Sequence, residues 1–167
     1  MVIRVLFVCH GNICRSPMCE FVFKDMVERM GIKDDFIIAS AATSTEEIWG
    51  DVGNPVYPPA KAELKRRGIG NTPYTDFSGK RAVQVTRKDY DSYDYILCAD
   101  SANIRNTTRI TGGDPEGKIR LLLDYTDRKG DSIADPWYTG DFVTTYEDII
   151  YGLQGFVRFL KEQNDIK

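Results

Sequence analysis

The opening of the chain constrains the fold more than any other feature. Residues 2–8 read Val-Ile-Arg-Val-Leu-Phe-Val, an almost wholly apolar run rich in β-branched residues, as in strands buried on both faces of a parallel sheet. A loop containing a glycine follows. Ser16-Pro17 then predicts a helix start, with serine as the N-cap and proline at the first helical position. A buried strand, a tight loop and a helix in this order form the opening unit of α/β folds.

The same alternation continues along the chain. The patterns predict further strands at residues 36–41, 93–99 and 119–124. They predict helices at residues 17–30, 58–67, 102–110 and 143–164, with irregular segments at 72–85 and 125–142. This alternation indicates a three-layer α/β fold, a four-stranded parallel sheet flanked by helices on both faces. No internal repeat or low-complexity linker divides the chain, so we expect a single domain over residues 1–167.

The charge balance and the hydropathy pattern bear on location and partners. The chain has 22 lysines and arginines against 25 aspartates and glutamates, a net charge of −3. This argues against nucleic acid as the main partner, because duplex-binding proteins usually carry a strongly basic surface. The longest apolar run, residues 5–9, is far shorter than the ~18–20 residues of a membrane span, and no export signal is visible. We therefore expect a cytoplasmic protein without a nucleic-acid or membrane partner, acting as a monomer or a weak dimer.

The four cysteines indicate thiol chemistry or burial rather than a disulfide scaffold. Cys9, Cys14 and Cys19 fall within eleven residues, and only Cys98 lies elsewhere. Such crowding without a secretory segment favours reactive or buried thiols. A zinc site is disfavoured, since paired Cys-x-x-Cys units are absent and the only histidine is His10. We expect no metal and no other cofactor.

The loop between the first strand and the first helix is the candidate phosphate site. It reads Cys9-His10-Gly11-Asn12-Ile13-Cys14-Arg15 and lies where doubly wound folds place their ligands. A helix N-terminus presents unpaired N–H groups and a partial positive charge. A loop curled over that end aims successive N–H groups at a dianion, and Gly11 and Asn12 tolerate the left-handed backbone that such a curl requires. The loop is therefore expected to cradle phosphate.

Two residues of this loop predict covalent chemistry. The helix end and Arg15 both favour the thiolate of Cys9, which is the nucleophilic form of the side chain. Arg15 can grip two phosphoryl oxygens through its planar fork and follow them as charge develops on them. Ser16 is placed to steady the thiolate when it becomes a leaving group. Taken singly, Cys9 would be a small buried hydrophobe and Arg15 a surface charge, so the inference depends on their spacing between a strand and a helix start.

Two segments resemble a known family. Residues 9–17 closely resemble the signature of the low-molecular-weight protein tyrosine phosphatases, and Asp135-Pro136-Trp137-Tyr138 matches a second motif of that family. The resemblance implies a four-stranded parallel sheet flanked by helices. It also implies a metal-free, two-step phosphoryl transfer through phosphocysteine, with phosphotyrosine proteins or peptides as substrates and phosphate or other oxyanions as product or inhibitor.

The resemblance also assigns roles to single residues of this chain. It implies that Cys9 is the nucleophile and Arg15 the phosphate clamp. It implies that Asn12 holds the loop in a strained shape through hydrogen bonds that reach Ser16 and Ser40. Cys14 is implied to trap an oxidised Cys9 as a disulfide, with a merely buried thiol as the alternative.

A phosphotyrosine phosphatase also needs an acid. Phenolate has a conjugate acid with a pKa of ~10, so protonation of the leaving oxygen speeds its departure. The spacing leaves several aspartates of the irregular segment open, namely Asp124, Asp127, Asp131 and Asp135, and Asp135-Pro136 could equally be a turn. The family match favours Asp135 as general acid and base. Trp137 and Tyr138 would then wall the cleft for an aryl ring, with ordinary core aromatics as the alternative.

Neighbouring reactions on the same fold remain alternatives. Arsenate reductases share the loop but need two further cysteines, and here only Cys98 lies beyond the first helix. Protein-arginine phosphatases carry a threonine where Ile13 stands, and a bulky apolar Ile13 favours a phenol ring over a guanidinium. A further alternative is a phosphate-binding module or phosphocysteine relay that does not hydrolyse its ligand.

Two positions around the site depart from the family pattern. Relatives often place an aromatic residue shortly after the serine that corresponds to Ser40, and here Trp49 is the candidate for that wall, displaced by an insertion in residues 44–53. Lys80 stands where many relatives have a histidine that supports the serine and asparagine network. This puts that support in doubt, although not the chemistry of Cys9.

Overall fold

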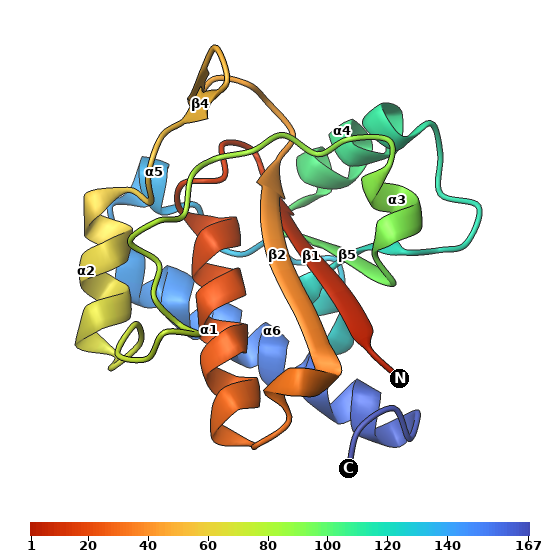
Figure 1. Cartoon of the computed structure of the whole chain (residues 1–167). Helices are drawn as coiled ribbons and strands as arrows, with labels where there is room; N and C mark the ends of the chain where they lie inside the picture. The colour runs from red at the N-terminus through yellow and green to blue at the C-terminus, as the bar shows by residue number, and fades with distance from the viewer.

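The structure of this chain, a computed structural model that describes all 167 residues, contains one parallel sheet. Its strands β1 (Ile3–Cys9), β2 (Phe36–Ala42), β5 (Tyr95–Cys98) and β6 (Ile119–Leu121) lie in the order β2-β1-β5-β6 (Figure 1). Every neighbouring pair is parallel. The predicted four-stranded parallel sheet is therefore confirmed.

Helices cover both faces of the sheet. α1 (Arg15–Arg29) and α6 (Phe142–Glu162) pack on one face, and α2 (Pro58–Arg66) lies beside them (Figure 1). α4 (Ser101–Thr111) and the short α3 (Asp89–Ser92) lie on the other face. The three-layer α/β arrangement thus agrees with the prediction. None of the helices combines the length and the apolar character needed to cross a membrane.

The apolar run of β1 is explained by burial on both sides. Ile3, Val5 and Phe7 belong to the core formed with α1 and α6. Leu6 and Val8 face the opposite core, which contains residues of α3 and α4. Successive side chains of a strand point to opposite faces of the sheet. A strand between two helical layers therefore needs apolar residues at consecutive positions, not only at every second one. This central strand delivers Cys9 to the carboxyl edge of the sheet.

The predicted cap of the first helix is wrong. α1 begins at Arg15, its N-cap position is Cys14, and no side chain caps it. Ser16 lies inside the first turn, and its hydroxyl contacts Cys9 and Asn12 instead of a helix N–H group. The predicted end is confirmed, because Met30 is the C-cap and Gly31 follows with a φ of 75°.

Several short elements were not predicted. The strand expected at 119–124 ends at Leu121 and continues as the 3-10 turn η2 (Leu122–Tyr125), and a second 3-10 turn, η1 (Lys33–Asp35), precedes β2. The segment expected to be irregular contains α5 (Pro136–Thr139). An antiparallel hairpin of β3 (Ile48–Trp49) and β4 (Val52–Gly53) stands apart from the main sheet (Figure 1). These elements have two to four residues each, too few for a periodic pattern to emerge.

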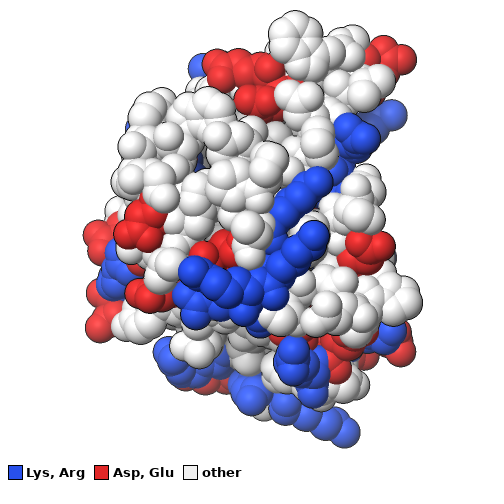
Figure 2. Space-filling view, turned by 90° about the vertical axis from the view of Figure 1, so that its left-hand side faces the viewer, with Lys and Arg blue, Asp and Glu red and all other residues white.

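Charged side chains are unevenly spread over the surface. On the side where α2 lies, a diagonal band of lysines and arginines crosses the molecule (Figure 2). Acidic side chains gather at the upper end of this face, the level at which Figure 1 places β4. The carboxyl edge of the sheet lies toward this same end.

Candidate active site

The site lies where the sheet order reverses. From β1 the chain moves to β2 on one side, and later to β5 on the other. The loops that follow β1 and β5 therefore diverge and leave a crevice between them, the usual ligand position in open α/β sheets. Cys9 ends β1, and Asp100 follows β5. Both residues line the same cavity.

The sulfur of Cys9 lies among hydrogen-bond donors. The backbone N–H groups of Asn12 and Ser16 donate to Sγ at 3.3 and 3.4 Å, and Ser16 Oγ lies 3.0 Å from it. These donors sit at the N-terminus of α1, where the helix dipole adds partial positive charge. The sulfur therefore faces hydrogen-bond donors and the positive end of the helix dipole.

Asn12 holds the loop in shape. It adopts the left-handed backbone region with a φ of 59°, as predicted from its residue type. Its Nδ2 donates to Ser16 Oγ at 2.7 Å and to Ser40 Oγ at 3.0 Å, the two hydrogen bonds that the family resemblance implied. Its Oδ1 accepts from the backbone N–H of Val83 at 3.1 Å. The side chain thus joins the loop to β2 and to the segment after Lys80.

The hydrogen-bond network of Asn12, Ser16 and Ser40 also includes Lys80 and Glu20. The sequence reasoning did not predict the part of Glu20. Ser40 Oγ donates to Glu20 Oε1 at 2.6 Å. Lys80 Nζ donates to the carbonyl of Ser40 at 2.9 Å and lies 3.8 Å from Glu20 Oε1. Burial lowers the pKa of Lys80, and the nearby Glu20 carboxylate opposes that shift. Lysine at this position therefore still supports Ser40, through its carbonyl and through Glu20.

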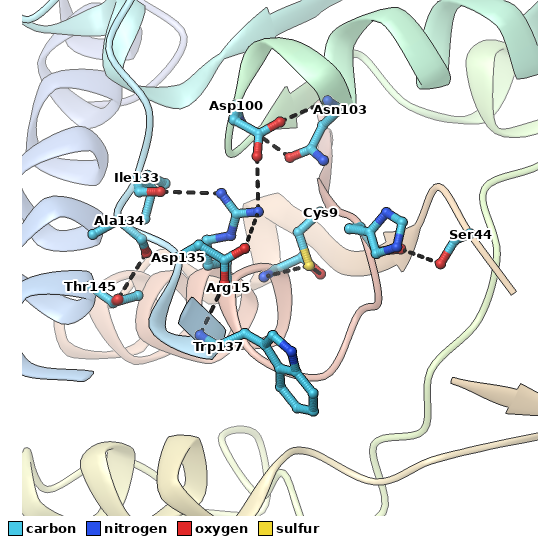
Figure 3. Close-up of polar contacts among 12 residues, drawn as sticks. Cys9, Arg15, Ser44, Asp100, Asn103, Ile133, Ala134, Asp135, Trp137 and Thr145 are labelled. Carbon is cyan, nitrogen blue, oxygen red and sulfur yellow. Dashed lines mark hydrogen bonds and ion pairs between the residues drawn. The ribbon is translucent and has the colours of Figure 1, made fainter. Parts of the chain in front are cut away.

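The guanidinium of Arg15 is buried and held from two sides. Nη1 donates to the carbonyl of Ile133 at 3.1 Å (Figure 3). Nη2 lies 2.9 Å from Asp100 Oδ2 and 3.3 Å from Asp135 Oδ2. Burial opposes the charge of Arg15, but Cys9, Asp135 and Asp100 outweigh it and raise its pKa. Arg15 therefore stays cationic with its planar group fixed over the cavity.

Asp100 was missed by the sequence reasoning. It is the N-cap of α4, where it accepts from the N–H of Asn103 at 2.8 Å while Asn103 Oδ1 accepts from the N–H of Asp100. The Asp-x-x-Asn spacing directly after a predicted strand was the available signal, because capping residues at carboxyl strand ends face the ligand crevice. The same carboxylate contacts Arg15 (Figure 3).

Asp135 is the aspartate of the irregular segment that reaches the cavity. It is the N-cap of α5, in an extended conformation before Pro136, and accepts from the N–H of Trp137 at 3.1 Å (Figure 3). The other candidates have different partners and do not line the cavity: Asp124 accepts from Gly130, Asp127 from Tyr151, and Asp131 pairs with Arg128. The structure therefore distinguishes Asp135, which lines the cavity, from three aspartates that the sequence spacing left equally possible.

The cavity has a volume of about 500 Å³ and an aromatic side. Trp137 and Tyr138 line it and are 56% and 85% exposed, so they are not core aromatics. The ring of Tyr57 supports Trp137 at a centroid distance of 5.2 Å. Ile13 lines the cavity as well. Trp49 is not among the lining residues; it is 73% exposed on the β3–β4 hairpin, and Glu46 and Glu47 line the cavity on that side.

The three cysteines other than Cys9 are poor thiolates. Burial and the neighbouring Cys9 raise the pKa of Cys14 to about 12, although Cys14 lines the cavity. Burial likewise raises the pKa of Cys19, and that of Cys98 to about 12. All four cysteines are free. The structure contains no group of three or more His, Cys, Asp or Glu side chains arranged to hold a metal ion.

Comparison with known proteins agrees with this geometry. The sequence profile of the family described as "Low molecular weight phosphotyrosine protein phosphatase" matches residues 4–165. A curated relative of that name from Gallus gallus is 40% identical over 157 residues, covering 92% of each chain. The low molecular weight protein-tyrosine-phosphatase YfkJ of Bacillus subtilis is 34% identical over 165 residues, covering 98% of this chain and 99% of the relative.

Solved structures show the same similarity in three dimensions. The crystal structure of YfkJ from Bacillus subtilis superimposes with a TM-score of 0.85 at 33% identity, covering 98% of this chain and 97% of that one. Vibrio vulnificus Wzb, solved in complex with benzylphosphonate, gives a TM-score of 0.75 at 26% identity, covering 96% of this chain and all of that one. The loop, the sheet and the match over nearly the whole sequence lead to one conclusion: the chain belongs to the low molecular weight phosphotyrosine protein phosphatase family.

Proposed function

We propose that this chain is a single-domain protein tyrosine phosphatase that hydrolyses phosphotyrosine and small aryl phosphates through a phosphocysteine on Cys9. The observation that carries the proposal is the convergence of three groups on one cavity. The cavity is lined by the sulfur of Cys9, which is surrounded by hydrogen-bond donors. It is also lined by the fixed guanidinium of Arg15 and the carboxylate of Asp135.

In the first step the thiolate of Cys9 attacks phosphorus. The S–P bond forms as the bond between phosphorus and the phenolic oxygen breaks, and Asp135 gives its proton to the departing oxygen. Arg15 and the N–H groups of the loop bind the nonbridging oxygens, on which charge develops. The distance of 3.3 Å between Arg15 Nη2 and Asp135 Oδ2 supports these two roles, because both side chains can then reach one substrate group.

In the second step water replaces the sulfur. Asp135, now a carboxylate, takes a proton from the attacking water, and the P–S bond breaks to release phosphate. The sulfur leaves as a thiolate, which the hydroxyl of Ser16 at 3.0 Å and the N–H groups of Asn12 and Ser16 stabilise. No redox change or metal is needed for either step to balance.

The apolar side of the cavity favours an aryl ester. Ile13, Trp137 and Tyr138 offer apolar and aromatic surface next to the loop, and aromatic pairs contribute about 0.5–1.5 kcal/mol beyond simple burial. Vibrio vulnificus Wzb, a solved relative, binds benzylphosphonate, a ligand with an aromatic ring beside a phosphorus oxyanion. Tyrosine-phosphorylated proteins or peptides are therefore the proposed substrates, and phosphate or other oxyanions the proposed product or inhibitors.

The alternatives have less support. Reduction of arsenate needs two accessible cysteines besides the nucleophile, and Cys19 and Cys98 are both buried, at 3% and 1% exposure. Ile13, an apolar residue, lines the cavity, which favours a phenol ring over a polar guanidinium. A relay module does not require an acid for the leaving group, yet Asp135 is held in the cavity by the N–H of Trp137.

Cys14 is proposed as the redox partner of Cys9. A sulfenic acid on Cys9 would condense with the thiol of Cys14 to a disulfide and water, which protects Cys9 from further oxidation. Both residues line the cavity. Peroxide treatment followed by mass mapping tests this step, and a Cys9–Cys14 disulfide that dithiothreitol reverses with recovery of activity is expected.

Turnover of three phosphopeptides tests the substrate class. Peptides that differ only in carrying phosphotyrosine, phosphoarginine or phosphoserine are compared with the purified protein, without added metal and at mildly acidic pH. The proposal expects phosphotyrosine to be hydrolysed fastest and Cys9→Ser to lose activity. Faster turnover of phosphoarginine would overturn the substrate assignment, and full activity of Cys9→Ser would overturn the mechanism.

A further inference from the structure

The part of the cavity lining that comes from the segment after β2 is acidic. Glu46 and Glu47 line it, between β2 and the β3–β4 hairpin. The sequence contains no lysine or arginine between Lys33 and Lys61, although the whole chain has 22 of them. Acidic side chains also gather at this end of the molecule in Figure 2. A site that receives a phosphate dianion is thus bordered by carboxylates.

Glu47 is fixed against the phosphate loop. A Cβ atom on Gly11 would lie 3.2 Å from Glu47 Cγ, so the glutamate stem passes directly over that glycine. Asn54 Nδ2 donates to Glu47 Oε2 at 2.7 Å, and the N–H of Asn54 donates to the carbonyl of Glu47 at 2.8 Å. The N–H of Ala82 in turn donates to the carbonyl of Asn54 at 2.9 Å. The carboxylate is therefore held in one place by neutral partners.

Glu46 is also held at the rim. Glu46 Oε2 lies 2.9 Å from His10 Nε2, and both side chains are more than half exposed. The hydroxyl and the N–H of Ser44 both donate to the carbonyl of His10, at 2.9 and 3.1 Å (Figure 3). The segment that carries the two glutamates is thereby attached to the phosphate loop itself.

The cavity supplies no lysine or arginine for these two carboxylates. Arg15 is its only such lining residue, and Arg15 is shared between Asp100 and Asp135. Glu47 has the amide of Asn54 as its partner, and Glu46 has a histidine that is cationic only when protonated. Uncompensated carboxylates beside an anionic substrate repel acidic flanking residues and attract basic ones.

We propose that Glu46 and Glu47 are specificity-determining residues that select phosphotyrosines flanked by lysine or arginine. The inference rests on the proposed function, since it names the substrate class of the same cavity. The phosphotyrosine ring lies against Ile13, Trp137 and Tyr138, and the cationic side chain next to it in the peptide contacts the carboxylates of Glu46 and Glu47, which line the same cavity. Peptides with acidic residues in that place are disfavoured by repulsion.

Two phosphotyrosine peptides test the proposal on the unmodified protein. They are identical except that the residues on both sides of the phosphotyrosine are Lys in one and Glu in the other. We expect kcat/KM to be ~10-fold higher for the Lys peptide at low salt, mainly through KM, because each partly exposed charge pair makes only a modest contribution to binding. The preference shrinks severalfold at 0.5 M salt, where charges are screened over ~4–5 Å.

Variants assign the preference to the two glutamates. In the double variant Glu46→Gln/Glu47→Gln, the kcat/KM values of the Lys and Glu peptides differ by no more than ~2-fold. The KM for para-nitrophenyl phosphate also falls, because the carboxylates no longer repel the dianion. Asp51→Asn at the hairpin tip, which removes one carboxylate outside the cavity lining, keeps most of the ratio. Glu47→Lys reverses the order of the peptides. Each ratio is taken within one variant, so a loss of folded protein cancels.

The outcomes separate this inference from the proposed function. Equal turnover of both peptides by the unmodified protein, or a ratio that survives in the double variant, overturns the role of Glu46 and Glu47 while leaving the phosphatase assignment intact. Failure of the unmodified protein to hydrolyse either peptide or para-nitrophenyl phosphate overturns the proposed function, and the specificity inference with it.

Discussion

Asp100 Oδ2 lies 2.9 Å from Arg15 Nη2, a contact that joins the loop after β5 to the phosphate loop after β1. Removal of its charge should leave Arg15 cationic but less firmly oriented. We expect Asp100→Asn to lower kcat for aryl phosphates ~10-fold or more, with KM unchanged or lower, because misplaced catalytic groups cost rate more than ground-state binding. Asn103→Ala is the matched control, since it removes the side-chain half of the α4 capping box but keeps the Asp100 carboxylate. A rise in KM with unchanged kcat would contradict the orienting role.

The loss of kcat on replacing Asp135, the proposed general acid, should depend on the leaving group of the substrate. We expect Asp135→Asn to slow kcat for phenyl phosphate by ~10²-fold or more, within the range of general acids, and to slow it less for esters with more acidic leaving groups, which need less protonation. Asp131→Asn removes a neighbouring carboxylate that pairs with Arg128 outside the cavity. An equal loss in that control would reassign the acid.

The strained conformation of Asn12 can be separated from its hydrogen bonds. Asn12→Ala loses three side-chain hydrogen bonds and places an alanine at a φ of 59°, whereas Asn12→Gly loses the same bonds without the steric penalty. We expect both to lower the free energy of unfolding and kcat, with alanine less stable than glycine by about 1–2 kcal/mol. Urea denaturation measures the difference. Equal stabilities would mean that the loop relaxes out of the left-handed region.

Thiol reactivity should single out Cys9. Burial and the Cys9 charge raise the pKa of Cys14 to about 12, and burial raises that of Cys98 to about 12. A thiol with a raised pKa stays neutral below that pH, so neither residue is a thiolate at pH 8. We expect iodoacetate at pH 8 to modify Cys9 alone, and inorganic phosphate to slow the reaction. Peptide mapping that found Cys14 modified as fast as Cys9 would contradict this account.

Much of the architecture could be predicted because its cause is local. The apolar β1 run, the loop with Gly11 and the amphipathic final helix each carry their pattern within one segment. The α1 start was mispredicted since the Ser16 hydroxyl is drawn to Cys9 and Asn12. Short elements such as α5 and the β3–β4 hairpin contain too few residues to show a hydrophobic periodicity in the sequence, so they could not be predicted from it.

The site was predictable where residues are adjacent in sequence, and less so elsewhere. The loop from Cys9 to Arg15 could be read as a unit. Asp100 lies 85 residues from Arg15 in the sequence, and the order of the strands in the sheet brings it to the cavity. Glu20 lies only 5 residues from Arg15, and the turns of α1 place it beside Ser40. The choice of Asp135 over its neighbours likewise needed three-dimensional information or the family motif.

The central claim is that the phosphoryl group passes through the sulfur of Cys9. Its most direct test is acid quenching during turnover of para-nitrophenyl phosphate, followed by mass spectrometry of the peptide that contains Cys9. The account predicts one added phosphoryl group on Cys9, lost within the time of one turnover when substrate is removed, and none in Cys9→Ser. Steady hydrolysis with no phosphoryl group on Cys9, or with one on another residue, would contradict it.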